Sequence, residues 1–435
     1  MKILYEITYG TRGNSGIPRD SKQVGKALLE KTDFSTDFIL NPRSFVSRNT
    51  FRKQNSIWVA QILGSSLRKE DSKFSALSLI EIVLAFLQSL SINRFVRKIY
   101  LNRDNSFRVL KFLNICKDVI NIKESKVVLM SISYPARFFR PKLFKPYKLS
   151  TKNYRIFIQQ QLDPISVSKN TVHIVRLHDV LPISHPQYFE DKGVRAFSKS
   201  LSIMLSGRKK IWVMDTEASA VNFKYSFGEN LDVRVIPCAV SVDLHQDSNF
   251  VFRKNQICIV NTIEPRKKVG FAISGFKQAK LLGRISADWE LVIVGEEGWQ
   301  ETKLVSNLRG KVFGQDINYV EGVTDFELKK IYKESKIILS TSDAEGFGLP
   351  PLEGMANGCV PVLSDIPQHR ETVADFGIFF NPGDLSSLVD SLAKAVKIGN
   401  DSPTDLSSKM QQHIVDNFSE ELISKKWFKL LNEFE

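Results

Sequence analysis

The residues best suited to hold a ligand lie in the segment TSDAEGFGLPPLEGMANG, directly after a predicted strand over residues 336–340. Gly346 and Gly348 let the backbone pass close to a ligand, because glycine has no Cβ to obstruct it. Pro350 and Pro351 suit the first turn of a helix, where a missing amide proton costs little. Since the free N–H groups at a helix start attract anions, we expect a diphosphate to bind there.

Two glutamates, Glu345 and Glu353, flank this glycine-rich turn. Both can border one cleft at the carboxyl ends of the strands, where their carboxylates would accept hydrogen bonds from sugar hydroxyls. In a chain with 47 acidic residues, two glutamates at this spacing are expected by chance, so the glycines and prolines between them carry the specificity. The alternative interpretation is a helix start that is stabilised by acidic side chains.

A basic segment, EPRKK at residues 264–268, follows a predicted strand over residues 257–261. Cations at a strand end that faces the same cleft would neutralise a diphosphate. Arg266 and Lys267 are the candidates for this role. Considered alone, the segment would also suit a basic surface turn.

His178 and a glycine-containing loop provide further candidates. His178 lies in RLHDVLPISHPQYF, just beyond a predicted strand, where a single histidine is more often structural than catalytic. The segment YGTRGNSGIPRD follows the first strand and contains Gly16 and Arg19. Its glycine spacing is a weak nucleotide fingerprint, and no acidic residue at the later strand end supports a nicotinamide site.

The elements that must position these residues follow an α/β pattern, in which short β-branched runs alternate with longer amphipathic segments. With 435 residues, the chain exceeds what one core usually organises, so we expect two domains, over residues 1–245 and 255–418. Residues 41–124 form a helical and basic insertion in the first domain, and residues 419–435 form a terminal helix capped by Ser419. The predicted strands lie at residues 2–8, 127–133, 155–160, 172–177, 211–214, 233–236, 257–261, 290–294, 336–340 and 360–364.

The composition is that of a soluble globular protein, with 43% hydrophobic and 25% charged residues. The four cysteines form no CxxC pair and suit buried thiols in a reducing compartment. The N-terminus has the pattern of a strand rather than that of a signal peptide. Residues 75–90 are apolar, but they include Glu81 and are shorter than the ~20 residues that cross a bilayer, so a buried or interfacial helix is expected.

The net charge of +14 implies a polyanionic partner. Residues 137–155 contain seven basic and five aromatic residues and no acidic one. This mixture suits a membrane interface with anionic headgroups, but also single-stranded nucleic acid or a solvated basic loop. A nucleic-acid-binding protein would align its basic residues along one face and bind in a salt-sensitive manner; the chain carries no recognition motif for that function.

The glutamates and the glycine-proline turn together resemble glycosyltransferase family 4, the group 1 retaining enzymes with the GT-B fold. The likeness extends over most of the C-terminal half, from residue 258 to about 395. In that family the first glutamate and the adjoining backbone amides hold the donor sugar, and the second glutamate binds the ribose. The resemblance assigns these roles to Glu345, Phe347, Gly348, Leu349 and Glu353.

The basic segment and the histidine segment are also similar to motifs of this family. EPRKK resembles EPRKN, whose arginine and lysine grip the donor diphosphate, here Arg266 and Lys267; Lys268 replaces the asparagine. HDVLP resembles HDL-P, whose histidine points at the donor sugar, here His178.

Two weaker likenesses complete the candidate site. The glycine loop is similar to a GGxGR loop on the acceptor side, here Gly16 and Arg19, although Pro18 replaces a glycine. EGVTDFELKKIY is similar to a segment whose backbone, here near Val323, contacts the nucleobase.

The resemblance implies two facing Rossmann-like domains with a cleft between them and a terminal helix that crosses back to the N-terminal domain. The donor would bind the C-terminal domain and the acceptor the N-terminal one, and transfer would retain the anomeric configuration. We expect no cofactor and no metal, because no Asp-x-Asp or histidine cluster with ligand spacing lies near the cleft.

HDVLPI resembles mannosyltransferases of bacterial surface polysaccharide synthesis, such as that of lipopolysaccharide or capsule. This likeness favours GDP-mannose as donor, with UDP-sugars open, and a lipid-linked glycan as acceptor. The chain would then act in the cytoplasm, peripherally bound to the inner face of the membrane. The alternatives are a GT-B nucleotide-sugar epimerase, which would turn over donor without acceptor, and a phosphorylase, which would need a pyridoxal lysine and a longer chain.

Overall fold

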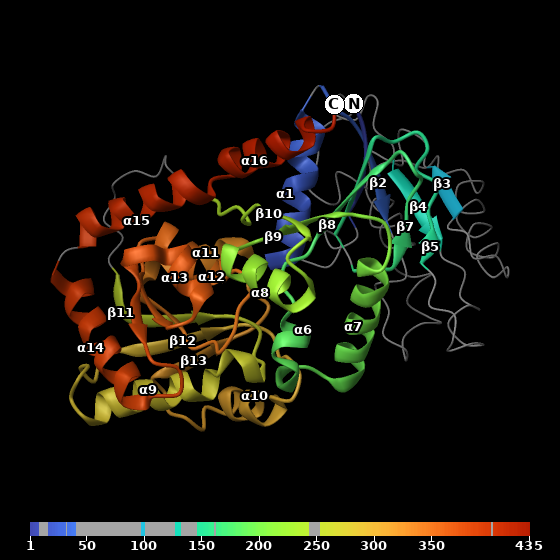
Figure 1. The fold of residues 1–435 in the computed structure, drawn as a ribbon. Helices are drawn as coiled ribbons and strands as arrows, with labels where there is room; N and C mark the ends of the chain where they lie inside the picture. Colours follow the sequence, from blue (N-terminus) through green and yellow to red (C-terminus); the bar gives the residue numbers. More distant parts are fainter. Residues whose placement is uncertain are drawn as a thin grey trace, which may run out of the picture.

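The computed structural model describes residues 1–7, 16–31, 33–40, 97–100, 127–131, 146–160, 162–242, 253–401 and 403–435. These residues form two α/β units that lie side by side, each built on a largely parallel sheet with covering helices (Figure 1). The α/β class that the sequence predicted is therefore confirmed. Residues 243–252, around the predicted domain boundary, lie outside the described ranges.

The N-terminal unit contains, over the described residues, an eight-stranded sheet in the order β10-β9-β8-β6-β1-β2-β4-β3. Neighbouring strands run parallel except β3 and β4, and the short β5 and β7 pair separately. The strands are β1 (Lys2–Glu6), β2 (Ser35–Leu40), β3 (Arg97–Tyr100), β4 (Val127–Ser131), β5 (Tyr147–Lys148), β6 (Ile156–Gln159), β7 (Ile165–Ser166), β8 (Val172–Arg176), β9 (Ile211–Met214) and β10 (Asp232–Val235). The helices are α1 (Gly16–Glu30), α6 (Leu181–Ser184), α7 (Asp191–Leu205) and α8 (Glu217–Phe227), with a 3-10 turn η4 (Pro186–Tyr188).

The C-terminal unit contains a six-stranded parallel sheet in the order β13-β12-β11-β14-β15-β16. Its strands are apolar on both faces, as expected where helices cover a parallel sheet from both sides. They are β11 (Lys254–Val260), β12 (Glu290–Val294), β13 (Ile317–Val320), β14 (Ser335–Ser340), β15 (Val360–Ser364) and β16 (Ile378–Phe380). The covering elements are η5 (Pro265–Lys267), α9 (Val269–Leu281), α10 (Thr302–Arg309), α11 (Asp325–Glu334), α12 (Leu349–Ala356), α13 (Pro367–Val373), η6 (Ala374–Phe376), α14 (Leu385–Asp401) and α15 (Pro403–Phe418).

Each predicted strand overlaps an observed one, and β9, β12 and β15 have the predicted bounds. Within residues 41–124, which the sequence predicted as a helical and basic insertion, β3 is a strand that pairs antiparallel with β4 at the sheet edge. The sequence RKIY of β3 is half basic, so no apolar run revealed it. The helix expected over residues 75–90 lies outside the described residues, as does most of the insertion.

The basic and aromatic stretch at 137–155 is described only from residue 146 onward, and its last two residues belong to the fold. Tyr154 is buried and donates a hydrogen bond to Asp37 Oδ2 at 2.7 Å. Arg155 Nε donates to the carbonyl of Phe434 at 2.8 Å. The prediction that this stretch faces a membrane was therefore wrong for Tyr154, which packs in a core cluster with Leu4 of β1 and Ile39 of β2.

The predicted cysteine environment is confirmed for the three cysteines within the described residues. Cys238, Cys258 and Cys359 are buried free thiols. Among the described helices, none is long and apolar enough to cross a bilayer.

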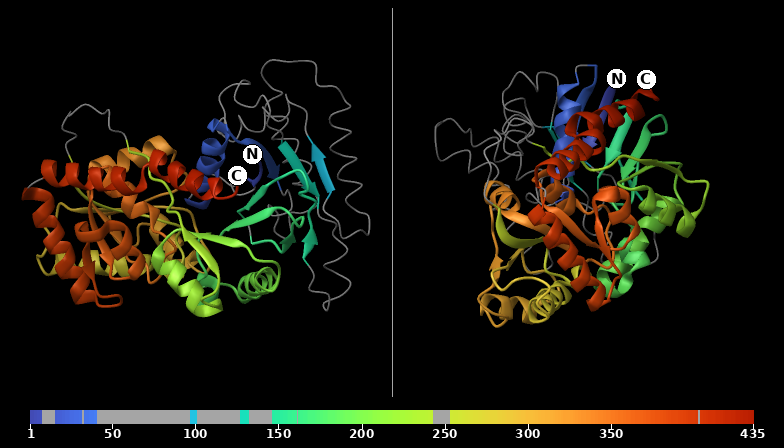
Figure 2. Two further views of the ribbon diagram at one scale, coloured as in Figure 1. Left: turned by 45° about the horizontal axis from the view of Figure 1, so that its top comes forward. Right: turned by 90° about the vertical axis from the view of Figure 1, so that its left-hand side faces the viewer.

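The last helix, α16 (Glu420–Asn432), crosses back and completes the core of the N-terminal unit. Figure 1 shows it running from α15 to lie beside α1, and both views of Figure 2 place the two termini close together. The Ser419 hydroxyl caps the helix by accepting from the Leu422 amide at 3.4 Å. Trp427 and Leu431 pack with Ile3 and other residues of β1. The crossing helix that the sequence predicted is confirmed.

We expect Trp427→Ala to lower the free energy of unfolding by about 3–5 kcal/mol, because it removes a large buried side chain from a well-packed core. Lys429→Ala, on the exposed side of the same helix, should change it by less than about 0.5 kcal/mol. Urea denaturation of both variants measures the difference. Equal effects would mean that α16 does not contribute to the N-terminal core.

Candidate active site

Two of the predicted functional segments leave the C-terminal sheet side by side. The segment EPRKK follows β11, and the glycine-proline turn follows β14, the strand next to β11. β12, which comes directly after β11 in the chain, lies on the other side of β11. The order of connections therefore reverses between β11 and β14, and open α/β sheets bind ligands in the crevice at such a point.

At this crevice the Glu345 carboxylate accepts hydrogen bonds from two basic side chains. Lys267 Nζ donates to Glu345 Oε1 at 2.5 Å, and Arg266 Nη1 donates to Oε2 at 2.9 Å. Arg266 also donates to Glu264 Oε1 at 2.6 Å and to the Ala344 carbonyl at 2.5 Å. Three of the residues that the sequence singled out thus form one buried ion cluster.

Burial and the neighbouring charges act in opposite directions on the pKa of each group in this cluster. Burial raises the pKa of Glu345, but the nearby charges of Lys267 and Arg266 outweigh it and hold this pKa far below its ordinary value. Burial lowers the pKa of Lys267, and the attraction of Glu345 only partly offsets that effect. Burial also opposes the charge of Arg266, but Glu345 and Glu264 raise its pKa above the usual value.

Glycine is required at two positions of the turn, Gly346 and Gly348, for different structural reasons. Gly348 has φ of +86°, a left-handed conformation that glycine adopts without strain, and it precedes α12. At Gly346 a Cβ would lie 2.9 Å from Asp179 Oδ2 and 3.3 Å from the carbonyl oxygen of His178. Glycine at position 346 therefore lets the histidine-containing loop of the N-terminal unit approach the turn closely.

Phe347 and Leu349 anchor this turn through their side chains. The ring of Phe347 is buried and meets Phe418 edge-on, with 5.6 Å between ring centroids. Leu349 opens α12 and packs at the edge of the same apolar cluster. Their backbone amides, at the start of α12, are the groups that remain for a ligand.

Glu353 lies one turn into α12 and is also ion-paired. It accepts a hydrogen bond from the Tyr332 hydroxyl at 2.9 Å, and Arg19 Nη1 contacts its other oxygen. Burial raises the pKa of Glu353 although Arg19 lowers it. Arg19 also lies 3.4 Å from Asp325, at the start of α11. The predicted acceptor-side arginine thus reaches across to the C-terminal unit.

The remaining two candidates lie on this same side of the molecule. Gly16 is the first residue of α1, the helix that carries Arg19. Val323 lies in the turn between β13 and α11, where Thr324 and Glu327 form a capping box. Arg19 contacts Asp325, two residues after Val323.

His178, directly after β8, is held by a partner that the sequence did not single out. Its Nδ1 lies 2.8 Å from Asp215 Oδ2, and its Nε2 is buried without a hydrogen-bond partner in the part of the chain that the structure describes. Burial lowers the pKa of His178, but Asp215 outweighs that effect and the pKa lies above the usual value. Asp215 also pairs with Arg176 Nη2 at 2.8 Å, and Arg176 pairs in turn with Asp20 at 3.1 Å.

Polar contacts join the donor-side turn to the N-terminal unit. The hydroxyls of Thr216 and Ser219 both donate to the Gly346 carbonyl at 3.1 Å. The Glu371 carboxylate accepts from the amides of Glu217 and Ala218 at 2.7 and 2.9 Å, and so caps α8 from the other unit.

A second contact between the units lies at the end of β14. The Tyr188 hydroxyl donates to Asp343, and Lys268 Nζ lies 3.2 Å from the same carboxylate. Lys268, which replaces the asparagine of the family motif, is thereby engaged with Asp343.

One group of metal-ligating side chains occurs among the described residues. Ligand atoms of Asp20, His178 and Cys238 lie within 4.8 Å of one another. The guanidinium of Arg176 contacts Asp20 and lies 3.6 Å from Cys238 Sγ. Because this fixed cation already neutralises the carboxylate, the group is poorly suited to a metal ion.

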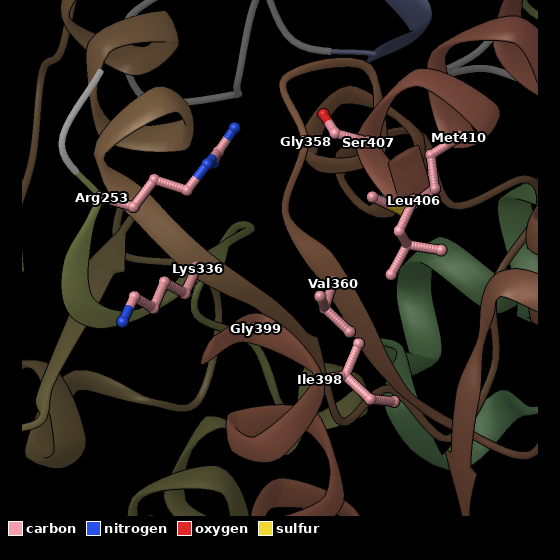
Figure 3. A pocket seen from close by; sticks show the side chains of 9 residues that line it. All are labelled: Arg253, Lys336, Gly358, Val360, Ile398, Gly399, Leu406, Ser407 and Met410. Carbon is pink, nitrogen blue, oxygen red and sulfur yellow. The ribbon is translucent and has the colours of Figure 1, made fainter. Parts of the chain in front are cut away.

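A small cavity lies at the opposite end of the C-terminal sheet. Its volume is about 10 Å³, the space of a single water. Figure 3 shows Arg253 and Lys336 on one side and the apolar side chains of Leu406, Met410 and Ile398 on the other. Arg253 and Lys336 belong to the amino ends of β11 and β14, so this cavity is separate from the crevice at Glu345.

Comparison with known proteins agrees with this architecture. Residues 242–413 match the family model for glycosyl transferases group 1. This match lies over the C-terminal unit and covers less than half of the chain. The structure of sucrose-phosphate synthase from Thermosynechococcus elongatus matches with a TM-score of 0.63 at 13% identity, over 100% of this chain and 98% of that one. The two-sheet arrangement is the GT-B fold.

Two curated relatives come from Escherichia coli. The serotype-specific mannosyltransferase WbdA is 23% identical over 238 residues, which cover 49% of this chain and 29% of that protein. The O-antigen chain mannosyltransferase B is 25% identical over 232 residues, which cover 49% of this chain and 58% of that protein. The matches therefore span well under two thirds of either relative.

We expect Glu345→Gln to lower the free energy of unfolding at neutral pH by about 3–5 kcal/mol, because it leaves two buried cations without their anion. The folded-state pKa of Glu345 is depressed, so its contribution is present above the ordinary value of 4.5 and is lost as pH falls below it. The gap between wild type and variant should therefore shrink in acid, as measured by urea denaturation across pH. The exposed Glu229→Gln is the control, and a gap independent of pH would contradict the assignment.

Proposed function

We propose that this protein is a glycosyltransferase that moves a sugar from a nucleotide-sugar donor to a glycan acceptor. The observation that carries the proposal is the convergence of Arg266, Lys267 and Glu345 at the crevice between β11 and β14, beside the start of α12. Two cations beside the start of a helix suit a diphosphate. The group 1 family match supports the same reaction class.

In the proposed mechanism, the sugar–oxygen bond to the donor diphosphate breaks while an acceptor hydroxyl attacks the same face of the sugar. The anomeric configuration is retained, and the proton of the hydroxyl leaves with the diphosphate. Negative charge builds up on the departing diphosphate, and Arg266 and Lys267 stabilise it there. They supply positive charge of the kind that a divalent cation supplies elsewhere, so we propose that no metal is needed. No other cofactor takes part.

We assign the sugar and the ribose of the donor to different residues around the crevice. Glu345 and the backbone amides of Phe347, Gly348 and Leu349 would hold the sugar, and Glu353 the ribose. The side-chain cluster at Glu345 would rearrange when the donor enters, since the diphosphate competes for the cations that Glu345 now holds. Arg19 would likewise release Glu353.

We propose mannose from GDP-mannose as the transferred sugar, supported by the two mannosyltransferase relatives. The acceptor would be a lipid-linked glycan of a bacterial surface polysaccharide, reached from the cytoplasmic side by peripheral binding to the membrane. The net charge of +14 is consistent with an anionic lipid surface.

A thermal-shift panel of GDP, UDP, GDP-mannose and UDP-sugars tests the donor. We expect GDP-mannose to raise the melting temperature most, equally with and without EDTA, because a ligand that binds only the folded state stabilises it. Glu353→Ala should reduce this shift. A chain that responds to none of these nucleotides would contradict the proposed donor site.

We expect Lys267→Ala to lower the turnover of sugar transfer by about a hundredfold, because it removes one preorganised donor to the leaving group. Lys277→Ala, an exposed lysine on α9, is the matched control and should keep wild-type turnover. Steady-state kinetics with the donor identified by thermal shift measures both. Wild-type turnover in Lys267→Ala would refute the assignment.

A further inference from the structure

Asp215, directly after β9, links His178 to a buried chain of charges. β9 lies next to β8 in parallel, with Arg176 opposite Val213, so the ends of the two strands bring Asp215 beside His178. The chain runs from His178 to Asp215 at 2.8 Å, from Asp215 to Arg176 at 2.8 Å, and from Arg176 to Asp20 at 3.1 Å. All four side chains are at least nine-tenths buried.

The neighbouring charged residues determine which groups can pair with the Asp215 carboxylate. Burying a charge is costly unless it is paired, and two carboxylates here share one guanidinium. The other titratable groups nearby are Asp179 and the Cys238 thiol, and burial raises the pKa of both, which disfavours their charged forms. A hydrogen bond from His178 therefore completes the pairing of Asp215.

An ionised carboxylate only accepts hydrogen bonds, so the His178 nitrogen that faces Asp215 must carry a proton. That nitrogen is Nδ1. In the neutral ring the other nitrogen, Nε2, is then the acceptor, and it is buried with no hydrogen-bond partner among the described residues. Buried polar atoms usually have a hydrogen-bond partner, so Nε2 is suited to accept a hydrogen bond from a ligand.

The same short segment also holds the donor-side turn. Thr216 and Ser219, one and four residues after Asp215, donate to the carbonyl of Gly346. The backbone of His178 and the side chain of Asp179 lie against Gly346 from the other strand end. The histidine and the turn that carries Glu345 are thus fixed to each other through residues 215–219.

We propose that Asp215 is a positioning residue, which fixes the orientation and tautomer of His178 so that Nε2 is left free for a hydroxyl of the donor sugar. The part that concerns the sugar rests on the proposed function. The part that concerns the tautomer rests on the Asp215–His178 contact alone.

The variant Asp215→Asn gives a sharp test because of Arg176. The single carbonyl oxygen of asparagine will pair with the Arg176 cation, which leaves the NH₂ group to face His178 Nδ1. Nδ1 must then accept, so the neutral ring must carry its proton on Nε2. We therefore expect ¹⁵N NMR of the side chain, at a pH where the ring is neutral, to show Nε2 changing from an unprotonated to a protonated nitrogen. The His178→Gln variant assigns the signal.

Asp20→Asn is the matched control, since it removes a buried carboxylate from the same chain of charges but leaves the His178–Asp215 hydrogen bond in place. We expect it to destabilise the fold while leaving the His178 tautomer unchanged. In transfer assays, kcat of Asp215→Asn should fall by about a hundredfold or more with KM little changed, as for a histidine held in the wrong tautomer. Asp20→Asn should retain most of its kcat.

An unchanged tautomer in Asp215→Asn would overturn the proposal, and so would equal losses of kcat in the two variants. The NMR measurement needs no activity, so it decides the role of Asp215 even if no sugar is transferred. Lack of transfer by the wild-type protein would count against the proposed function only.

Discussion

A carboxylate buried at the end of a strand must be paired with positive charge, and this requirement organises the centre of the molecule. Glu345 is kept ionised by Lys267 and Arg266, which come from the loop after the neighbouring strand. The ion cluster joins the β11 and β14 loops and so sets the shape of the crevice between them. Because a diphosphate would compete with Glu345 for these cations, the proposed binding of the donor would have to rearrange the cluster.

Specific polar contacts join the two units around the same crevice. The Gly346 carbonyl accepts from Thr216 and Ser219, and Arg19 crosses to Glu353. Each of these contacts ends on a residue of the glycine-proline turn or of the helix that follows it. The position of the N-terminal unit is therefore coupled to the groups that would hold a donor.

The sequence predicted the parts of this arrangement that leave a local pattern. Apolar runs revealed the central strands, and glycine with proline after a strand end revealed the turn at Gly346. Short or basic strands such as β3 left no such run, and only pairing with a neighbour defines them. The Asp215 contact was missed because residues 37 positions apart carry no joint signal in one sequence; its one local hint is an acidic residue after the predicted strand at 211–214.

The packing of α16 has a consequence for how the polypeptide acquires its structure. Trp427 and Leu431 fill the core around β1, although the entire C-terminal sheet separates them from it in the chain. During synthesis the N-terminal unit therefore cannot complete its core until the ribosome has released α16. Until then, part of its apolar interior is exposed. The halves of this protein are not interchangeable modules, and a split gene would have to supply α16 together with the first half.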